Sequence, residues 1–484
     1  MQRLSGTDSL FLAGETAAWH QHVGGLSIID PTGVPGFSFD AVVRSIDDRL
    51  PAIPKLTWKL RQVPLSLDRA FWVPDPEFDV FRHVHRIDVP APGGPRETAA
   101  TVGQILGAQL DRNRPLWEIW YLDNLINGRV GFLMKYHHCL LDGVAGSAMA
   151  ALLFDVEPSP AMHDRPPLPE PASEPSDASL FVRSLMPSIA VPWRLARYGV
   201  SLGRRVVDVV GYAASKHPKP DLSAMAQAPR TSFNHAIGPQ RAMAFTSVAI
   251  DDLKRLCHHH DVKLNDIALA VCSGALRIYL DDRTELPMRT LTAGIPVSTR
   301  AKGDTILDNQ MSYMIVPLAT DVDDPTERVR AIYSHTRAAK ELAAALRAHP
   351  IDSVGAALPP WMLGIAMRAA YRSHLLSYVP GMTNTLISNV TGPPFPLYLA
   401  GAPLSGAFPA SVILEGMGLN ITVFSFDGRF DFGIHVDPNL VPQPWDLAAA
   451  VHTALAELLA AAGLGPPTSV KDPFGLQTTA MPSS

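Results

Sequence analysis

The fold is decided around seven residues, His137-His138-Cys139-Leu140-Leu141-Asp142-Gly143. They follow an apolar stretch, 129–136, which comes directly after the turn signal Asn127-Gly128 and predicts a strand. They precede a stretch of small and apolar residues of helical length, 144–154. The seven residues are therefore expected on a turn from strand to helix, where Gly143 would let the chain turn sharply.

This motif contains groups that can move protons. An imidazole suits proton transfer near neutral pH because its unperturbed pKa lies at about 6.5, and Asp142 could orient the motif through a salt bridge. A His four residues before an Asp is weak by itself, since 17 histidines give about one chance match. Indeed there is a second pair, His217 and Asp221, which has two prolines between its members and lies in the linker region. Taken alone, the motif fits either a catalytic base or a buried structural His pair.

The chain around the motif mixes strand and helix signals, which predicts an α/β fold of the α+β type. Beyond the motif, the expected helices are 251–281, with a break near Asp261, 325–348 and 445–462. The expected strands are 291–295, 312–318, and a hairpin of 420–426 and 430–436 joined through Asp427-Gly428-Arg429.

A chain of 484 residues is long enough for two domains of ordinary size. The Pro-rich, polar stretch 157–179 has the composition of a linker. We therefore expect an N-terminal domain over 1–156, a connector over 157–230, a C-terminal domain over 231–465 and a loose tail over 466–484.

The connector contains an amphipathic stretch, 181–212, that predicts one or two helices interrupted at Pro187 and Pro192. It is basic until Asp208, with Arg183, Arg194, Arg197, Arg204 and Arg205. Two interpretations stay open: a helix packed on the body with a solvated basic face, or a contact with a membrane or lipid-droplet surface.

Composition narrows the functional class. The net charge of −5 with mixed signs gives no reason to expect nucleic acid as a partner. Three cysteines argue against a disulfide framework and for a reducing compartment.

Prolines interrupt the longest uncharged region, 373–414, so no segment is expected to span a bilayer. The cluster Cys257-His258-His259-His260 has no second ligand pair at zinc spacing, and we expect a solvated surface there rather than a metal site. A cytoplasmic protein is expected.

The motif resembles the HHxxxDG signature of the bacterial wax ester synthase/diacylglycerol acyltransferase family, relatives of the chloramphenicol acetyltransferase-like acyltransferases. Residues 4–460 are similar to the family throughout, and Thr391, Asp308 and Cys139 depart from its pattern without removing a catalytic group. Further matching motifs, in family order, are Leu4-Ser-Gly-Thr-Asp-Ser-Leu-Phe, His22-Val-Gly-Gly-Leu-Ser-Ile, Pro115-Leu-Trp117, Asn265-Asp266, Ile295-Pro-Val-Ser-Thr-Arg300, Ser388-Asn-Val-Thr-Gly-Pro393, Pro396-Leu-Tyr-Leu-Ala-Gly-Ala402 and Gly418-Leu-Asn-Ile-Thr-Val423.

This resemblance implies two chloramphenicol acetyltransferase-like domains with the active site in a channel between them. It implies that His138 removes the proton from an alcohol hydroxyl, which attacks the thioester carbonyl of acyl-CoA without an acyl-enzyme. His137 would support the site, and Asp142 would brace the loop, for example against Arg300. No permanently bound cofactor is expected, and acyl-CoA would be the cosubstrate.

The resemblance leaves several roles open. Asn265 would shape the site or cap a helix, Asp266 would be structural, and Trp117 would pack in the core or line the channel. The acceptor would be diacylglycerol or a long-chain alcohol, met at a lipid droplet or the inner membrane. The alternatives are an acyltransferase of the same fold with another alcohol acceptor, and a catalytically silent lipid-binding protein.

Overall fold

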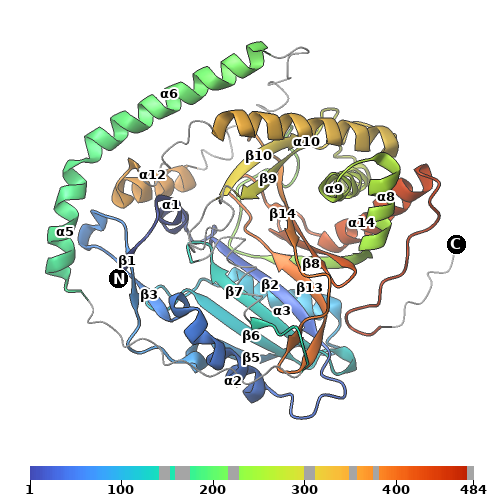
Figure 1. Cartoon of the computed structure of the whole chain (residues 1–484), viewed down its shortest axis with the longest axis horizontal. Helices are drawn as coiled ribbons and strands as arrows, with labels where there is room; N and C mark the ends of the chain where they lie inside the picture. The colour runs from blue at the N-terminus through green and yellow to red at the C-terminus, as the bar shows by residue number, and fades with distance from the viewer. Residues whose placement is uncertain are drawn as a thin grey trace.

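The computed structural model describes residues 1–140, 153–158, 175–215, 228–298, 311–347, 357–373 and 381–476. Two six-stranded mixed sheets form the centre of the molecule, and a small three-stranded sheet lies beside them (Figure 1). Helices cover the outer faces of both large sheets. This mixture of helices and strands is the α+β architecture that the sequence predicts.

The first large sheet carries the His137-His138 end of the motif. The expected strand at 129–136 is confirmed as a central strand of this sheet. All neighbours are antiparallel except the parallel pair β5 and β6. In sheet order the strands are β12 (Tyr398–Leu399), β13 (Ala402–Ala410), β2 (His22–Ile29), β7 (Val130–His137), β6 (Trp117–Asp123) and β5 (Val84–Asp88).

Helix α3 (Pro95–Gly107) covers one face of this sheet. It begins with a proline at its first position, and the Glu97 carboxylate accepts a hydrogen bond from the Gly94 amide, so its first turn is capped. Its apolar side packs Val102 and Leu106 on Leu26. The other face receives α1 (Gly6–Gly14), α2 (Phe39–Arg49) and the small sheet of β1 (Gln2–Arg3), β4 (Phe71–Pro74) and β3 (Trp58–Arg61).

The second large sheet contains the predicted hairpin. Its turn residues Asp427 and Gly428 have φ values of 42° and 76°, the positive values that a two-residue hairpin turn requires. In sheet order the strands are β10 (Met311–Pro317), β9 (Thr292–Ser298), β11 (Thr385–Thr391), β14 (Leu419–Phe426), β15 (Arg429–Val436) and β8 (Ala242–Ala249).

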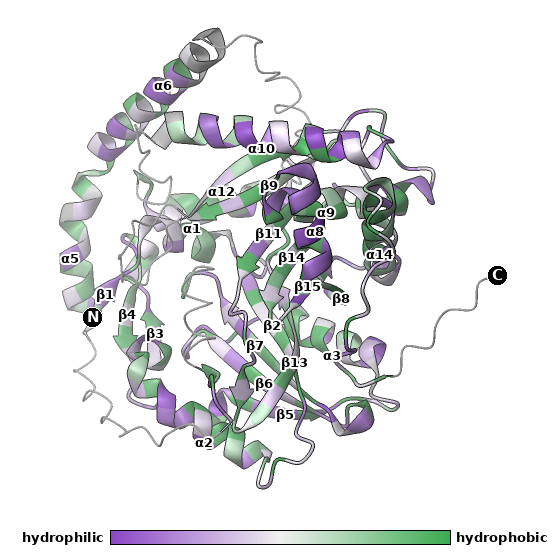
Figure 2. Ribbon diagram, turned by 45° about the vertical axis from the view of Figure 1, so that its right-hand side comes forward, coloured by the Kyte–Doolittle hydropathy of each residue, from purple (hydrophilic) through white to green (hydrophobic). Residues whose placement is uncertain are grey.

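Four helices pack on this second sheet, and the helix predictions are confirmed within a residue or two. The break expected near Asp261 is present, because Asp261 has a φ of 52° and ends a helix in the left-handed conformation. Figure 2 shows α9 and α14 as largely hydrophobic, consistent with their central position in the core. The helices are α8 (Ile250–His260), α9 (Leu264–Asp281), α10 (Pro325–Arg347) and α14 (Pro444–Ala461); α12 (Pro360–Arg372) packs instead against α1.

Strand β13 joins the two sheets. It comes late in the chain, yet it pairs with β2 of the first sheet. The fully buried Asp431 of β15 accepts hydrogen bonds from the Ala407 amide at 2.8 Å and from the Ser247 hydroxyl at 2.6 Å. At Gly433 the two backbones lie so close that a Cβ atom would overlap the Pro409 carbonyl. Sheet membership therefore does not follow chain order, and the predicted boundaries at 156 and 231 stay predictions.

Residues 466–476 differ from the expected loose tail. The Phe474 side chain is 1% exposed and packs on Phe245. Ser405 donates a hydrogen bond to the Pro473 carbonyl and Arg429 donates one to the Lys471 carbonyl. A short apolar anchor is enough to hold such a segment, and composition alone did not reveal it. Residues 477–484 lie outside the described part.

The connector forms two helices, as its sequence predicts. Helix α5 (Asp177–Ile189) contains Pro187, and α6 (Val191–Ser215) begins after a break at Ala190. Together they form an arm that runs along the left and upper rim of the molecule, away from the two large sheets (Figure 1). Among the described residues, none of the helices combines the length and apolar content that a bilayer crossing requires.

Candidate active site

The turn after β7 is fixed by its backbone. His137 pairs with His22 at the end of the β2–β7 ladder. The His138 amide donates a hydrogen bond to the Gln21 carbonyl at 2.9 Å, and the Leu140 amide donates one to the His137 carbonyl at 2.9 Å. The buried Lys55 ammonium donates to the Leu140 carbonyl at 2.8 Å. These bonds determine where the two imidazoles lie.

The His138 side chain borders a cavity between the two large sheets. Its ring stacks on Phe11 of α1, with centroids 4.2 Å apart and planes 15° apart. The residue is only 5% exposed. Stacking on Phe11 fixes the plane of the His138 imidazole.

His137 is fully buried and faces away from the cavity, toward Glu15. Its Nδ1 atom accepts a hydrogen bond from the Cys139 amide at 3.1 Å. In the neutral ring the hydrogen therefore lies on Nε2, which is 3.6 Å from a Glu15 carboxylate oxygen. His137 is thus held between the turn and Glu15, and its supporting role in the site stays a prediction.

Glu15 is a buried carboxylate shared by several partners. It accepts hydrogen bonds from the Arg112 guanidinium, and its other oxygen lies 3.5 Å from His22 Nε2. Burial acts to raise the pKa of Glu15, but the neighbouring His137 and His22 rings and the Arg112 guanidinium outweigh it. The pKa is held well below its usual range, so the carboxylate stays ionised.

His22 is neutral at pH 7, because burial lowers its pKa to about 3. Its contact with Glu15 is therefore a polar contact between a neutral ring and an anion rather than an ion pair. The anion is balanced by Arg112, whose side chain reaches the surface. Behind the motif, the ionised Glu15 carboxylate thus contacts the His22 and His137 rings and pairs with Arg112.

Two further predicted residues, Trp117 and Asp266, make structural contacts. Trp117 is 3% exposed, donates a hydrogen bond to the Leu56 carbonyl at 2.6 Å and stacks on His83, so it packs in the core. Asp266 caps α9 through the Lys263 amide and accepts a hydrogen bond from Thr336, as a structural residue does.

Four predicted positions are not tied to the site by the described residues. Asn265 is half-buried near the start of α9 and is not part of the described cavity wall. Asp142, Gly143 and Arg300 lie outside the described residues, as does the stretch from 144 to 152. Their predicted roles stay predictions.

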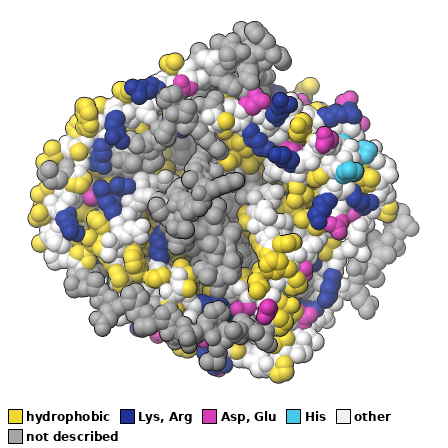
Figure 3. Space-filling model, in the orientation of Figure 1, with side chains coloured by type: hydrophobic (Ala, Val, Ile, Leu, Met, Phe, Trp, Pro, Cys, Tyr) yellow, Lys and Arg dark blue, Asp and Glu magenta, His cyan; other side chains and the backbone are white. Residues whose placement is uncertain are grey.

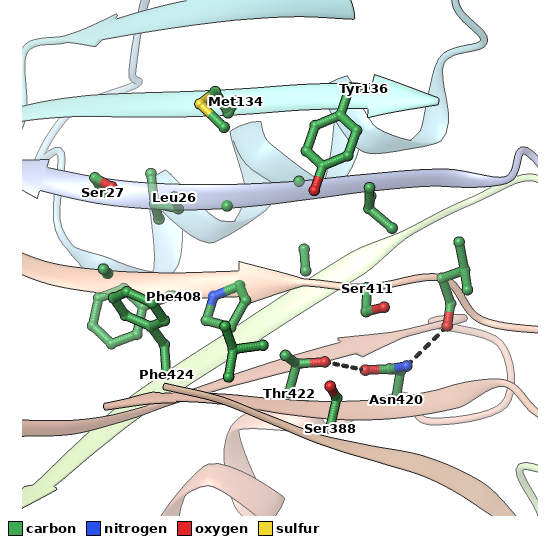
Figure 4. Close-up of a pocket in the computed structure, with 18 of the residues that line it drawn as sticks. Leu26, Ser27, Met134, Tyr136, Ser388, Phe408, Ser411, Asn420, Thr422 and Phe424 are labelled. Atoms are coloured by element: carbon green, nitrogen blue, oxygen red, sulfur yellow. Dashed lines mark hydrogen bonds between the residues drawn. The ribbon is translucent and has the colours of Figure 1, made fainter. Parts of the chain in front are cut away.

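The cavity beside His138 has a volume of about 190 Å³. Its wall near His138 includes a polar group on the second sheet, where Thr422 donates to the Asn420 side chain at 2.7 Å and Asn420 donates to the Val412 carbonyl at 3.0 Å (Figure 4). Val412 lies at the His22 end of the first sheet, because Ala410 pairs with Gly24 and the chain continues in that direction.

The far part of the cavity is apolar. It is bordered by side chains of both sheets and of the segments next to them, namely Phe132, Phe154, Val390, Leu397, Leu404 and Phe424. A base at a polar end and an apolar extension together suit a reaction at the head of a hydrocarbon chain.

Sequence reasoning missed Phe11, Glu15 and Lys55. One signal for Glu15 was present: it is the one acidic residue between Asp8 and Asp30, in an apolar stretch that also contains His20 and His22. An isolated carboxylate in such a stretch is buried only with partners. Phe11 ends one of the matching motifs, but that match alone does not place it at the site, and no local pattern does so for Lys55.

Comparisons with known proteins agree with this architecture. The family profile "Wax ester synthase/diacylglycerol acyltransferase catalytic domain" matches residues 4–268, and "WS/DGAT C-terminal domain" matches residues 307–459. A putative diacylglycerol O-acyltransferase of Mycobacterium tuberculosis is 32% identical over 465 residues, covering 95% of this chain and 90% of that protein. A probable diacylglycerol O-acyltransferase of the same species is 32% identical over 475 residues, covering 96% and 100%.

Comparison with solved structures points to the same family and to a known fold. The wax ester synthase/diacylglycerol acyltransferase from Marinobacter aquaeolei is 27% identical, with a TM-score of 0.67 over 96% of this chain and 100% of that one. The first condensation domain of the calcium-dependent antibiotic synthetase has a TM-score of 0.55 at 14% identity, covering 97% and 98%, which shows a common fold. The fold is thus the chloramphenicol acetyltransferase-like one that was expected.

Proposed function

The chain belongs to the wax ester synthase/diacylglycerol acyltransferase family, and from this premise we propose that it transfers a long-chain acyl group from acyl-CoA to an alcohol hydroxyl in the cavity at His138. The enzyme is an O-acyltransferase of the diacylglycerol O-acyltransferase and wax ester synthase type. One observation carries the assignment of the site: His138 borders a cavity that lies between the two sheets.

In the proposed reaction His138 acts as general base. It takes the proton of the acceptor hydroxyl as the oxygen attacks the thioester carbonyl carbon. The tetrahedral intermediate then collapses, the carbon–sulfur bond breaks, and the CoA sulfur takes the proton back from the imidazolium. The products are an ester and free CoA thiol, so no group of the protein is consumed.

Three residues support this role without touching the reacting atoms. The stacked Phe11 ring limits rotation of the His138 ring. Glu15 orients His137, and Lys55 holds the Leu140 carbonyl, so the turn that carries His138 has little freedom. We assign Phe11, Glu15 and Lys55 as positioning residues, and we keep Asp142 as a brace of the same loop.

We further propose that the enzyme meets its lipid substrates at an anionic lipid surface through the α5–α6 arm. Along this arm large apolar side chains are exposed, with Ile189 at 75%, Trp193 at 73% and Val207 at 69%. Basic side chains lie between them, and Figure 3 shows dark blue and yellow side chains next to each other along the left rim, where the arm lies. Exposed apolar area combined with basic charge is the pattern of an interfacial helix.

Thiol release tests the proposed function. Purified protein with palmitoyl-CoA should release CoA thiol when given diacylglycerol or hexadecanol in detergent, and mass spectrometry should show the corresponding ester. Release with only a short alcohol or another hydroxyl would favour the alternative of a different acceptor. No release with any acceptor, combined with palmitate binding, would favour the silent lipid-binding alternative.

A further inference from the structure

Strand β2 presents two small residues to the cavity. The cavity wall includes residues 23–27 of β2, but side chains alternate along a strand. Val23, Gly25 and Ser27 pair with cavity-wall residues of β7, so their side chains lie on the cavity face. The Leu26 side chain lies on the other face, where it packs with α3. Gly25 lies between Pro409 of β13 and Met134 of β7. Ser27 lies between Ala407 of β13 and Phe132 of β7. Two consecutive inward positions of a central strand thus carry almost no bulk.

The glycine at position 25 is not required by the backbone. A Cβ atom built there has no heavy atom within 4 Å, and its φ does not lie in the left-handed region. The neighbouring Gly24 differs, because its Cβ would lie 2.6 Å from the Met134 carbonyl oxygen. Gly24 is therefore explained by packing, whereas at Gly25 the missing side chain leaves open space that belongs to the cavity.

These positions lie at increasing distance from the reacting end. His22 pairs with His137, and a strand rises roughly 3.3 Å per residue, so Gly25 lies roughly 10 Å beyond His22 and Ser27 roughly 7 Å further. The polar group of Asn420 and Thr422 is at the near end and the apolar wall is at the far end. A chain whose head is at His138 would pass Gly25 before it reaches Ser27.

We propose that Gly25 and Ser27 form the floor on which the acyl chain of acyl-CoA lies, and that the bulk at these positions sets the longest chain accepted. This inference rests on the proposed acyl transfer at His138. At about 190 Å³ the cavity is smaller than a typical ligand pocket of roughly 300–1,000 Å³. The apolar far wall suits a hydrocarbon chain whose head lies at His138.

The experiment compares Gly25→Leu and Ser27→Leu with wild type on butanoyl-, octanoyl-, dodecanoyl- and palmitoyl-CoA, with one short soluble alcohol as acceptor. Gly25→Leu should lose activity on the two longest chains by about tenfold or more and keep it on butanoyl-CoA. Ser27→Leu should lose palmitoyl-CoA first and keep shorter chains. Ala461→Leu is the control, because it adds bulk at an exposed position at the end of α14 and away from the cavity, and its profile should follow wild type.

A second series varies the alcohol length at fixed octanoyl-CoA. Folding is checked for each variant by its melting temperature. If the variants change the alcohol profile and leave the acyl profile unchanged, the floor holds the acceptor and the acyl assignment is wrong. Equal losses on all acyl chains would also overturn it. The proposed function fails separately, by absence of thiol release from wild type with every acyl-CoA.

Discussion

The turn that carries His138 and the α5–α6 arm differ in nearly every physical respect. At the turn, backbone amides, the Lys55 ammonium and the stacked Phe11 ring hold a buried imidazole. On the arm, Ile189 and Trp193 are largely exposed. Contacts with the body include the ion pair of Arg61 with Asp177 of α5 and the packing of α6 near α10.

The turn and the arm suit two different tasks. Proton transfer needs fixed geometry and little water, whereas contact with a lipid surface needs accessible apolar and basic groups. Changes at the turn should therefore affect turnover even with soluble substrates. Changes on the arm should affect only reactions at a lipid surface.

The largest effect is expected at His138. The His138→Ala variant should release CoA thiol about 10²–10⁴-fold more slowly than wild type, since it lacks the general base. His137→Ala should only weaken activity, because this ring supports the turn. The exposed His259 offers a control, and His259→Ala should match wild type. Wild-type rates in a folded His138→Ala protein would refute the assignment.

Acid pH should lower the free energy of unfolding, because two buried imidazoles are neutral in the folded protein. Burial lowers the pKa of His22 to about 3 and that of His435 to about 4, so both are neutral in the folded protein at pH 5 but protonated in the unfolded chain. The unfolded state then binds more protons, and stability falls as pH drops below about 6.5. The loss from pH 7 to pH 5 should be about 4 kcal/mol for the two rings.

Urea unfolding at the two pH values measures this loss. The His435→Asn variant provides the comparison, because Asn can still donate to the Ser411 carbonyl that His435 contacts at 2.6 Å. It should reduce the difference between pH 5 and pH 7 by about half. A stability that is the same at pH 5 and pH 7 would show that these imidazoles are not neutral in the folded state.

A smaller loss is expected when the support of the turn is changed. Glu15→Gln removes the charge that orients His137 and should lower kcat roughly 10- to 100-fold, because a small displacement of a catalytic group is costly. The KM for acyl-CoA should change little, since Glu15 does not border the cavity. Glu285→Gln, at an exposed position, is the matched control. A raised KM with unchanged kcat would contradict the positioning role.

The smallest effect on chemistry is expected from the arm. A variant with Arg194, Arg197, Arg204 and Arg205 changed to Gln should no longer float with anionic liposomes at low salt. Each arginine near such a surface contributes about 1 kcal/mol, screened by salt. Turnover of a short soluble alcohol should stay at the wild-type rate. Wild type itself should dissociate from the liposomes at high salt.

A control for the arm replaces four exposed arginines elsewhere, Arg44, Arg289, Arg330 and Arg337, by Gln. This protein has the same net charge as the arm variant. It should float like wild type if the position of the charges matters. Flotation of the arm variant at the wild-type level would mean that the arm does not dock, and the interpretation of a solvated basic face would hold.

Local pattern predicted much of this fold. Strand β7, the hairpin of β14 and β15, and helices α10 and α14 each follow from a periodic or turn signal within their own residues. The position of β13 does not, because its partner β2 lies several hundred residues earlier and no local feature of 402–410 specifies that sheet. Tertiary pairing decides such strands, and one sequence contains no measure of it.

The site was predicted to a similar extent. His138 is predicted from the resemblance to the HHxxxDG signature, since the spacing of His and Asp alone is weak. The structure places His138 beside the cavity, and its role as general base stays a prediction. Glu15 and Arg112 form a hydrogen bond although they lie nearly a hundred residues apart in the sequence. Whether Gly25 leaves open space in the cavity depends on the strands that pack beside it. These relations arise from packing rather than from spacing.

The late entry of β13 into the first sheet affects how the protein can be made. A ribosome delivers β2 and β7 long before residue 410, so β2 waits with an open edge until almost the whole chain has emerged. An open strand edge during synthesis invites pairing with other nascent chains, and pairing partners so far apart in sequence form slowly. The buried Asp431 contact with Ala407 then closes the sheet late. A gene cut at the connector would yield a first fragment that lacks β12 and β13, so the two fragments would have to be produced together.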